Sequence, residues 1–385
     1  MRFGDGWPCC DGIVIPMDLA TIMHEQSEKR PRARDLGLPL QGTPGADNAI
    51  TDVPGLTVGM TTLKDEGQGI HTGVTAILPR PSADLLHPCW AGSFSMNGNG
   101  EMTGVHWIRE AGWMTGPVTI TNTFSIGIAH HASARWMARR FPDVVGEDVW
   151  VLPVAAETYD GYLSDIAGFH VTEDHVLAAI DNAAGGPVPE GSVGGGTGMI
   201  AYEFKGGTGT SSREVTIGGE TYTLGCLVQA NHGLRPWLTV CGKPVGEQMA
   251  ENRIYEAERG SIIVVLATDA PLLPTQLDRL ARRASIGIGR GGTPSGNNSG
   301  DIFLAVSTAN DPGPLPEPPR FKLDALSNDR LDPMFMGVVD CVEEAVLNAM
   351  LAATPVTGRK GRFVPALDTD RLMAAMGMAP SGHKT

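Results

Sequence analysis

The sequence predicts an α+β fold in which helices pack on stacked β-sheets. Short runs of apolar and β-branched residues recur between Gly, Pro, Asn or Asp residues, which is typical of buried strands. Helical periodicity is strongest in three segments, 130–140, 275–284 and 338–352. Because strands and helices do not alternate strictly, this arrangement is favoured over a Rossmann fold.

The expected strands are short and spread along the whole chain. In chain order they are 74–78, 118–122, 149–154, 224–229, 262–268 and 302–307. A hairpin is expected at 215–223, because Gly218 and Gly219 separate two β-branched runs. The proline-rich stretch 312–319 is expected to be a surface excursion or linker, since few of its residues can join a ladder.

The longest helical pattern lies near the C-terminus. In 338–352, Val342 and Val346 share one face, and Glu343 and Glu344 are expected to face solvent.

Composition and charge exclude several classes of partner. The 385 residues include 29 Lys and Arg against 43 Asp and Glu, a net charge of −14. An acidic chain does not provide the basic surface that nucleic acid requires. No stretch approaches the roughly 20 apolar residues of a membrane span, and the N-terminus lacks the pattern of a signal peptide. We therefore expect no nucleic-acid or membrane partner and a cytoplasmic protein.

Cofactor-binding motifs are incomplete. The glycine-rich runs at 194–198 and 206–209 lack the Lys-Ser/Thr pair of a phosphate-binding loop, and Met199 follows the first run. His130 and His131 are adjacent, so on a helix they point about 100° apart and cannot easily share one ion. The six cysteines are scattered, without the spacing of a zinc or redox site. We expect no metal and no organic cofactor.

Ser261 occupies a distinctive position, between a polar loop that ends in Gly260 and the apolar run 262–268. If the Gly260–Ser261 bond were cut, Ser261 would carry both a hydroxyl nucleophile and a free α-amine. Such an amine has a pKa of about 7.7–8.0, which suits a general base at neutral pH. From composition alone, a simple turn before a strand is the more economical interpretation.

A series of ordered motifs resembles the self-processing peptidases of the L-aminopeptidase D-Ala-esterase/amidase (DmpA) and β-peptidyl aminopeptidase family. The motifs cover about 320 residues and lie at 32–37, 48–53, 97–104, 156–161, 194–200, 228–233, 260–269 and 296–301. Each motif alone is modest evidence, but their common order is highly specific.

The resemblance implies a four-layer αββα sandwich similar to the N-terminal nucleophile hydrolases, with different connectivity. It implies a precursor that cleaves itself between Gly260 and Ser261 into fragments 1–260 and 261–385, which stay associated. A homo-oligomer of such αβ units, a tetramer by resemblance, is expected. The fragments are expected to form one domain over 31–375, with an N-terminal extension at 1–30 and a flexible tail at 376–385.

The resemblance also assigns roles to residues of this chain. Ser261 matches the nucleophile and supplies the α-amine, and Asn231 and Tyr159 match groups that stabilise the oxyanion. Ser299 and Asp301 match residues that contact the hydroxyl and amine of the nucleophile. The implied reaction releases N-terminal residues from small peptides, amino-acid amides or esters through an acyl-enzyme.

Substrate binding is expected to involve two further residues. Glu157 is expected to share a strand face with Tyr159 and to bind the free ammonium of the substrate. Asn122 is expected to line the pocket. Some β-peptide-cleaving relatives carry Glu where this chain has Asp301, so the preference among L, D and β residues stays open.

Two alternatives remain at this point. An acyltransferase of the ornithine acetyltransferase type would share a related fold, but those enzymes cleave themselves at a Thr, whereas this chain has Ser261. An uncleaved, non-enzymatic binding module would have no reason to split at that bond.

Overall fold

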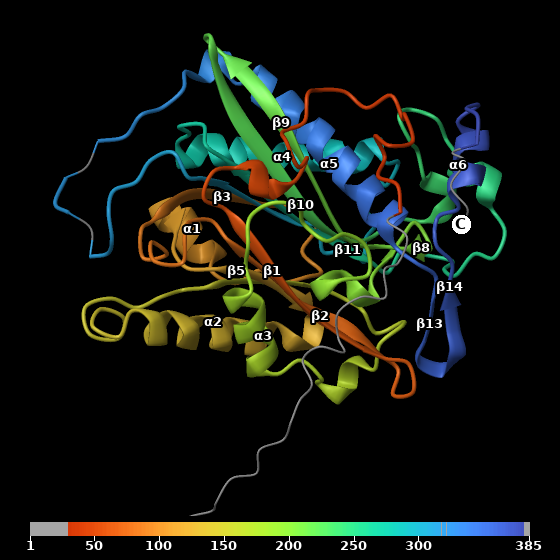
Figure 1. Cartoon of the computed structure of the whole chain (residues 1–385), viewed down its shortest axis with the longest axis horizontal. Coiled ribbons are helices and arrows are strands. Elements are labelled where there is room, and N and C mark those ends of the chain that lie inside the picture. Colours follow the sequence, from red (N-terminus) through yellow and green to blue (C-terminus); the bar gives the residue numbers. More distant parts are fainter. Residues whose placement is uncertain (1–29, 317, 321, 381–385) are drawn as a thin grey trace, which may run out of the picture. The chain divides into compact units, whose positions relative to one another are not determined.

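Two β-sheets stack against each other and carry helices on their outer faces (Figure 1). The structure, a computed structural model, describes residues 30–316, 318–320 and 322–380. Residues from Pro31 onward form one unit. Apart from residue 30, the expected N-terminal extension lies outside the described residues, and so do residues 381–385 of the expected tail. At the start of that tail, Met376 is buried and Met378 packs against the core.

The first sheet has four strands in the order β1-β2-β5-β6. They are β1 (Thr57–Asp65), β2 (Ile70–Leu78), β5 (Val118–Asn122) and β6 (Val154–Thr158). β5 and β6 are parallel, and the other neighbours are antiparallel.

The second sheet has six strands in the order β4-β3-β12-β11-β10-β9. They are β4 (Trp113–Met114), β3 (Cys89–Ser95), β12 (Ile302–Ser307), β11 (Ser261–Thr268), β10 (Glu220–Asn231) and β9 (Gly207–Ile217). β11 is central, because it pairs with β10 antiparallel and with β12 parallel. Two small ribbons complete the strands: β7 (Ile200–Ala201) with β8 (Phe204–Lys205), and β13 (Val356–Gly358) with β14 (Arg362–Val364).

Helices form the two outer layers, although the first helix places its buried Ile108 in the apolar cluster between the sheets. They are α1 (Val105–Ala111), α2 (Ile126–Arg140), α3 (Glu173–Asp181), α4 (Pro274–Arg290), α5 (Asp332–Ala352) and α6 (Thr369–Ala375). α2 and α3 bury Trp136 and Ile180 against the four-stranded sheet, and α4 and α5 bury Leu280 and Val342 against the six-stranded sheet. Within the described residues, none of the helices combines the length and apolarity that crossing a bilayer requires.

The central strand shows why the layers form. Ile263 and Val265 of β11 face the four-stranded sheet, whereas Ile262 and Val264 face the outer helices. A strand that is buried on both faces is apolar at every position instead of alternating. The predicted αββα sandwich is therefore confirmed, and the run 262–268 is its central strand.

The hairpin prediction is confirmed as well. β9 ends at Ile217 and β10 begins at Glu220, and Gly218 and Gly219 between them have φ of 65° and 93°. Glycine adopts this left-handed region without steric cost, so the pair permits the tight turn.

Two local predictions are wrong. The strand expected at 149–154 starts only at Val154, because Pro153 has no N–H for a ladder and Trp150 is 76% exposed rather than buried. Glu344, expected to face solvent, is fully buried, since α5 packs against both β9 and α4 and has little exposed surface. Its carboxylate pairs with the buried guanidinium of Arg213 at 2.7 Å.

Candidate active site

Ser261 is the first residue of β11 and lies opposite Asn231, the last residue of β10. Its side chain is almost fully enclosed, at 5% exposure, and its Oγ accepts a hydrogen bond of 3.3 Å from the N–H of Gly300. The preceding residue is tightly packed too, because a Cβ on Gly260 would lie 1.7 Å from the carbonyl oxygen of Asn231. The Gly260–Ser261 bond is therefore held against the end of β10.

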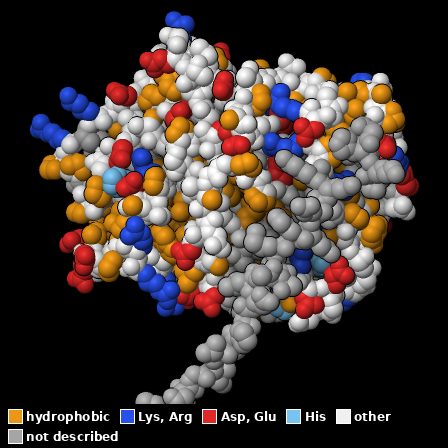
Figure 2. Space-filling model, in the orientation of Figure 1, with side chains coloured by type: hydrophobic (Ala, Val, Ile, Leu, Met, Phe, Trp, Pro, Cys, Tyr) orange, Lys and Arg blue, Asp and Glu red, His pale blue; other side chains and the backbone are white. Residues whose placement is uncertain are grey.

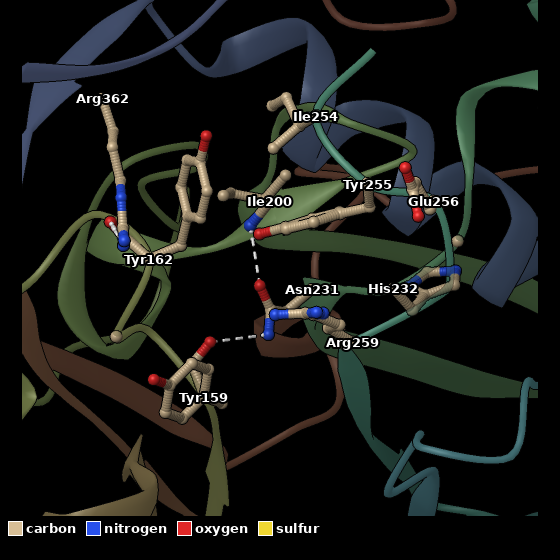
Figure 3. Close-up of a pocket in the computed structure, with 13 residues that line it drawn as sticks. Tyr159, Tyr162, Ile200, Asn231, His232, Ile254, Tyr255, Glu256, Arg259 and Arg362 are labelled. Carbon is tan, nitrogen blue, oxygen red and sulfur yellow. Dashed lines mark hydrogen bonds between the residues drawn. The ribbon is translucent and has the colours of Figure 1, made fainter.

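The side-chain amide of Asn231 is fixed by two hydrogen bonds (Figure 3). Its Oδ1 accepts from the N–H of Ile200 at 2.8 Å, and its Nδ2 donates to the carbonyl of Tyr159 at 2.9 Å. An amide nitrogen has two N–H donors, so one remains for another acceptor. Asn231, which pairs with Ser261, therefore presents an N–H donor in a fixed position.

Asp301 lies on the opposite side of Ser261 from Asn231, next to β12. Its Oδ1 accepts from the hydroxyl of Ser299 at 2.6 Å and from the N–H of Ile262 at 3.1 Å. Its Oδ2 accepts from the hydroxyl of Ser295, which the sequence analysis did not identify. Burial raises the pKa of Asp301, and these hydrogen bonds oppose the rise. The predicted site residues Ser299 and Asp301 are therefore in contact, and Asp301 is hydrogen-bonded to Ile262, the residue after Ser261.

Glu157 is buried near the end of β6, at 3% exposure. Its Oε1 accepts from the N–H of Glu101 at 2.9 Å, and its Oε2 accepts from the hydroxyl of Thr123. Burial raises the pKa of this carboxyl, and both hydrogen bonds oppose the rise. A Cβ on Gly100 would lie 3.2 Å from Oε1 and 3.1 Å from the Cα of Gly300. Only a thin layer of backbone therefore separates Glu157 from the loop that contacts Ser261.

Tyr159 and Glu157 do not share a strand face as expected, because β6 ends at Thr158. Tyr159 is 45% exposed, and a Cβ on Gly161 would lie 2.3 Å from its Oη, so the phenol folds over that glycine. Asn122 is buried, donates to the Oγ1 of Thr72 and accepts from the N–H of Ser125. These bonds give Asn122 a capping role at the end of β5.

A pocket of about 450 Å³ lies next to Gly260 (Figure 3). Its lining includes the predicted residues Tyr159 and Asn231, together with side chains that the sequence analysis did not identify. Among these are Tyr162, Tyr255, Glu256, Arg259 and Arg362. They come from distant segments without a common motif, so no local pattern could have grouped them.

Glu258 is a further residue that sequence reasoning missed. It lies three positions before Ser261 and is buried. One carboxylate oxygen accepts from the N–H of Gly233 and, at 3.4 Å, from the Thr293 hydroxyl; the other accepts from the N–H of Gly296 at 2.6 Å. One side chain thus ties the segment before Ser261 to the end of β10 and to the loop that carries Ser295 and Asp301.

The glycine-rich run 194–198 and His232 are part of the protein interior. Gly194–Gly198 forms a buried 3₁₀ helix. Burial lowers the pKa of His232 to about 3, and its ring packs edge-on against Tyr202. The part of the chain that the structure describes contains no group of three or more His, Cys, Asp or Glu arranged to hold a metal ion. Acidic and basic side chains are interspersed on the face shown in Figure 2.

Taken together, the site contains a hydroxyl at the start of a central strand, a fixed amide donor, an acid coupled to two serines and a buried carboxylate. A hydroxyl beside an N–H donor is the arrangement needed for acyl transfer, since attack on a carbonyl creates an oxyanion.

Comparisons with known proteins identify a peptidase family. The model of peptidase family S58 matches residues 48–364. β-Peptidyl aminopeptidase BapA of Sphingosinicella microcystinivorans is 46% identical over 372 residues, which cover 91% of this chain and 93% of that protein. Neither the acyltransferase nor the binding module is favoured by these matches.

Two solved structures have the same fold. The L-aminopeptidase D-Ala-esterase/amidase from Ochrobactrum anthropi, a variant of the Ntn hydrolase fold, has a TM-score of 0.87 and 53% identity over 90% of this chain and 98% of that chain. A β-aminopeptidase from Burkholderia sp. has a TM-score of 0.83 and 46% identity over 92% and 100%.

Proposed function

Because the chain belongs to peptidase family S58, we propose that it is an N-terminal nucleophile aminopeptidase that releases N-terminal residues from small peptides, amino-acid amides or esters. The observation that carries this proposal is the position of Ser261 at the start of the central strand, opposite Asn231 and directly after the tightly packed Gly260.

The first step of the proposal is self-cleavage. Ser261 Oγ attacks the carbonyl carbon of Gly260, the C–O bond forms, and the C–N bond breaks with transfer of a proton to the nitrogen. The free Nδ2 hydrogen of Asn231 is a candidate donor to the intermediate oxyanion. Water then hydrolyses the ester, which leaves a carboxylate on Gly260 and a free α-amine on Ser261.

The mature reaction uses that amine. It accepts the proton of Ser261 Oγ as the hydroxyl attacks the substrate carbonyl, and returns it to the leaving amine. Asp301 accepts hydrogen bonds from the Ser299 hydroxyl and from the N–H of Ile262, and so positions the first residues of β11 for this transfer. Water hydrolyses the acyl-enzyme and restores the hydroxyl.

Glu157 accounts for the requirement for a free N-terminus. An ammonium beside this buried carboxylate would compensate the cost of burying its charge. An internal peptide group carries no charge, so it would leave the carboxylate uncompensated. The site therefore favours an aminopeptidase over an endopeptidase.

The assembly is part of the proposal. The fragments 1–260 and 261–385 stay associated, because β11 and β12 lie between β10 and β3 in one sheet. We extend this to a homo-oligomer of αβ units, a tetramer by resemblance, and to a cytoplasmic location.

The test is the Ser261→Ala variant. Wild-type protein should separate on a denaturing gel into fragments of 260 and 125 of its 385 residues, about 27 and 13 kDa of the total 40.6 kDa. Ser261→Ala should stay at 40.6 kDa and fail to hydrolyse an amino-acid amide. The control is Ser285→Ala, whose hydroxyl in α4 has no hydrogen-bond partner and whose loss should leave cleavage unchanged. Cleavage of Ser261→Ala at the same bond, or full activity of an intact wild type, would contradict the mechanism.

A further inference from the structure

The pocket beside Gly260 has an excess of positive charge. Two arginines, Arg259 and Arg362, line it together with a single acid, Glu256. Both guanidinium charges act on the same phenol, that of Tyr255: burial raises its pKa, and each of the two charges opposes the rise. Both arginines and Tyr255 line the same pocket.

Arg362 is held in place without an acidic partner. Its Nη1 donates to the carbonyl of Tyr162 at 3.0 Å, and its guanidinium lies 4.7 Å from the centre of the Tyr162 ring (Figure 3). Among the described residues, no carboxylate lies within ion-pair distance of Arg362 or Arg259. By contrast, Arg359 on the same hairpin pairs with Asp165 at 3.3 Å. A guanidinium has five N–H donors, so most of those on Arg362 are unmatched.

The pocket borders the immediate neighbours of Ser261, since Gly260 precedes it in the chain and Asn231 pairs with it in the sheet. If the ammonium of a substrate lies at Glu157 and its carbonyl at Ser261, the residues after the cleaved bond extend away from Glu157. Glu157 does not line the pocket, whereas Asn231, Tyr159 and Gly260 do. The chain of a bound peptide would therefore pass from Glu157, across Ser261, into the pocket.

We propose that this pocket is a carboxylate subsite in which Arg362 binds the anion. Its planar fork of donors suits bidentate recognition of a carboxylate. Two carboxylates have the right chemistry: the C-terminus of a dipeptide substrate, and the new C-terminus of Gly260 formed by self-cleavage. The proposal rests on the proposed function, and the first source would make unblocked dipeptides better substrates than their amides.

The test compares Arg362→Gln with wild type on L-alanyl-L-alanine and on its C-terminal amide. Loss of about tenfold or more in kcat/KM for the dipeptide through KM, with the amide unchanged, identifies the substrate carboxylate as the ligand. An equal loss for both substrates identifies the carboxylate of Gly260 as the ligand. Without Arg362 this carboxylate would no longer be held in the pocket, and it would compete with either substrate at the Ser261 amine. No change for either substrate overturns the subsite.

The control is Arg359→Gln, which removes the same charge from the same hairpin outside the pocket and should not alter the ratio of the two rates. Intact mass and melting temperature show whether each variant is folded and cleaved. If Arg362→Gln does not fold, the wild-type preference for the dipeptide should fall with rising salt, and a preference independent of salt overturns the proposal. If wild type cleaves neither substrate, the proposed function fails instead.

Discussion

Replacement of Glu258 by glutamine should slow self-cleavage while the chain still folds. The carboxylate accepts backbone hydrogen bonds from Gly233 and Gly296, one on each oxygen. Glutamine has only one oxygen, so its NH2 group must face one of the two N–H donors. The segment that leads to Gly260 would then lose one of the two backbone hydrogen bonds that this side chain accepts.

The magnitude follows from the type of bond. A hydrogen bond to a charged group contributes about 1.5–3 kcal/mol. If the free energy of the aligned conformation of the Gly260–Ser261 bond rises by this amount, that conformation becomes less populated and cleavage slows about ten- to a hundredfold. Misalignment at a reacting centre has effects of similar size, since a shift of about 1 Å can cost a hundredfold in rate.

Cell-free synthesis followed by a chase measures this rate, because precursor and fragments separate on a denaturing gel. The matched control is Glu251→Gln, seven positions upstream, which removes a solvent-exposed pair with Arg371 that contributes little to stability. Stability is compared between Ser261→Ala chains with and without Glu258→Gln, so that both remain uncut. Cleavage of Glu258→Gln at the wild-type rate, or equal slowing by Glu251→Gln, would refute the positioning role.

Two further predictions concern stability, measured by denaturant unfolding of uncut Ser261→Ala chains. Burial raises the pKa of Asp160 from 3.8 to about 7. Between these pH values only the unfolded chain has released the proton, so the free energy of unfolding falls as pH rises. Asp160→Asn should remove this dependence, and an unchanged pH profile would contradict the prediction. Glu344→Gln leaves the buried guanidinium of Arg213 without its charge partner and should cost about 3–5 kcal/mol; a loss below about 1 kcal/mol would show that the pair is not needed.

Features set by local sequence were predictable. The apolar run 262–268 became the central strand, because burial on both faces requires apolar residues at every position. The hairpin at Gly218 and Gly219 followed from the backbone freedom of glycine. Ser261 stood out because it joins a polar loop to such a strand, but local sequence alone favoured a simple turn there. The ordered motifs of the family selected Ser261, together with Asn231 and Asp301.

Features set by distant partners were not predictable. Glu344 is buried because two distant guanidinium groups, those of Arg213 and Arg34, compensate its charge. Glu258 acquires its role only when the fold brings Gly233 and Gly296 to its two oxygens. Helical periodicity contains no information about such partners, so a charged residue on α5 was assigned to the surface.

The position of Ser261 in the sheet means that the proposed cleavage would change the molecularity of folding. β11 and β12 would belong to the fragment that begins at Ser261, and they lie between β10 and β3, which would belong to the other fragment. Before cleavage, one chain forms these ladders in a unimolecular reaction. After cleavage, two denatured pieces would have to meet again, so recovery would depend on their concentration, while the folded pair would be held by the same ladders. Under the proposed self-cleavage, the covalent link would be needed to build the sheet once and would be dispensable afterwards, which would make maturation a one-way step.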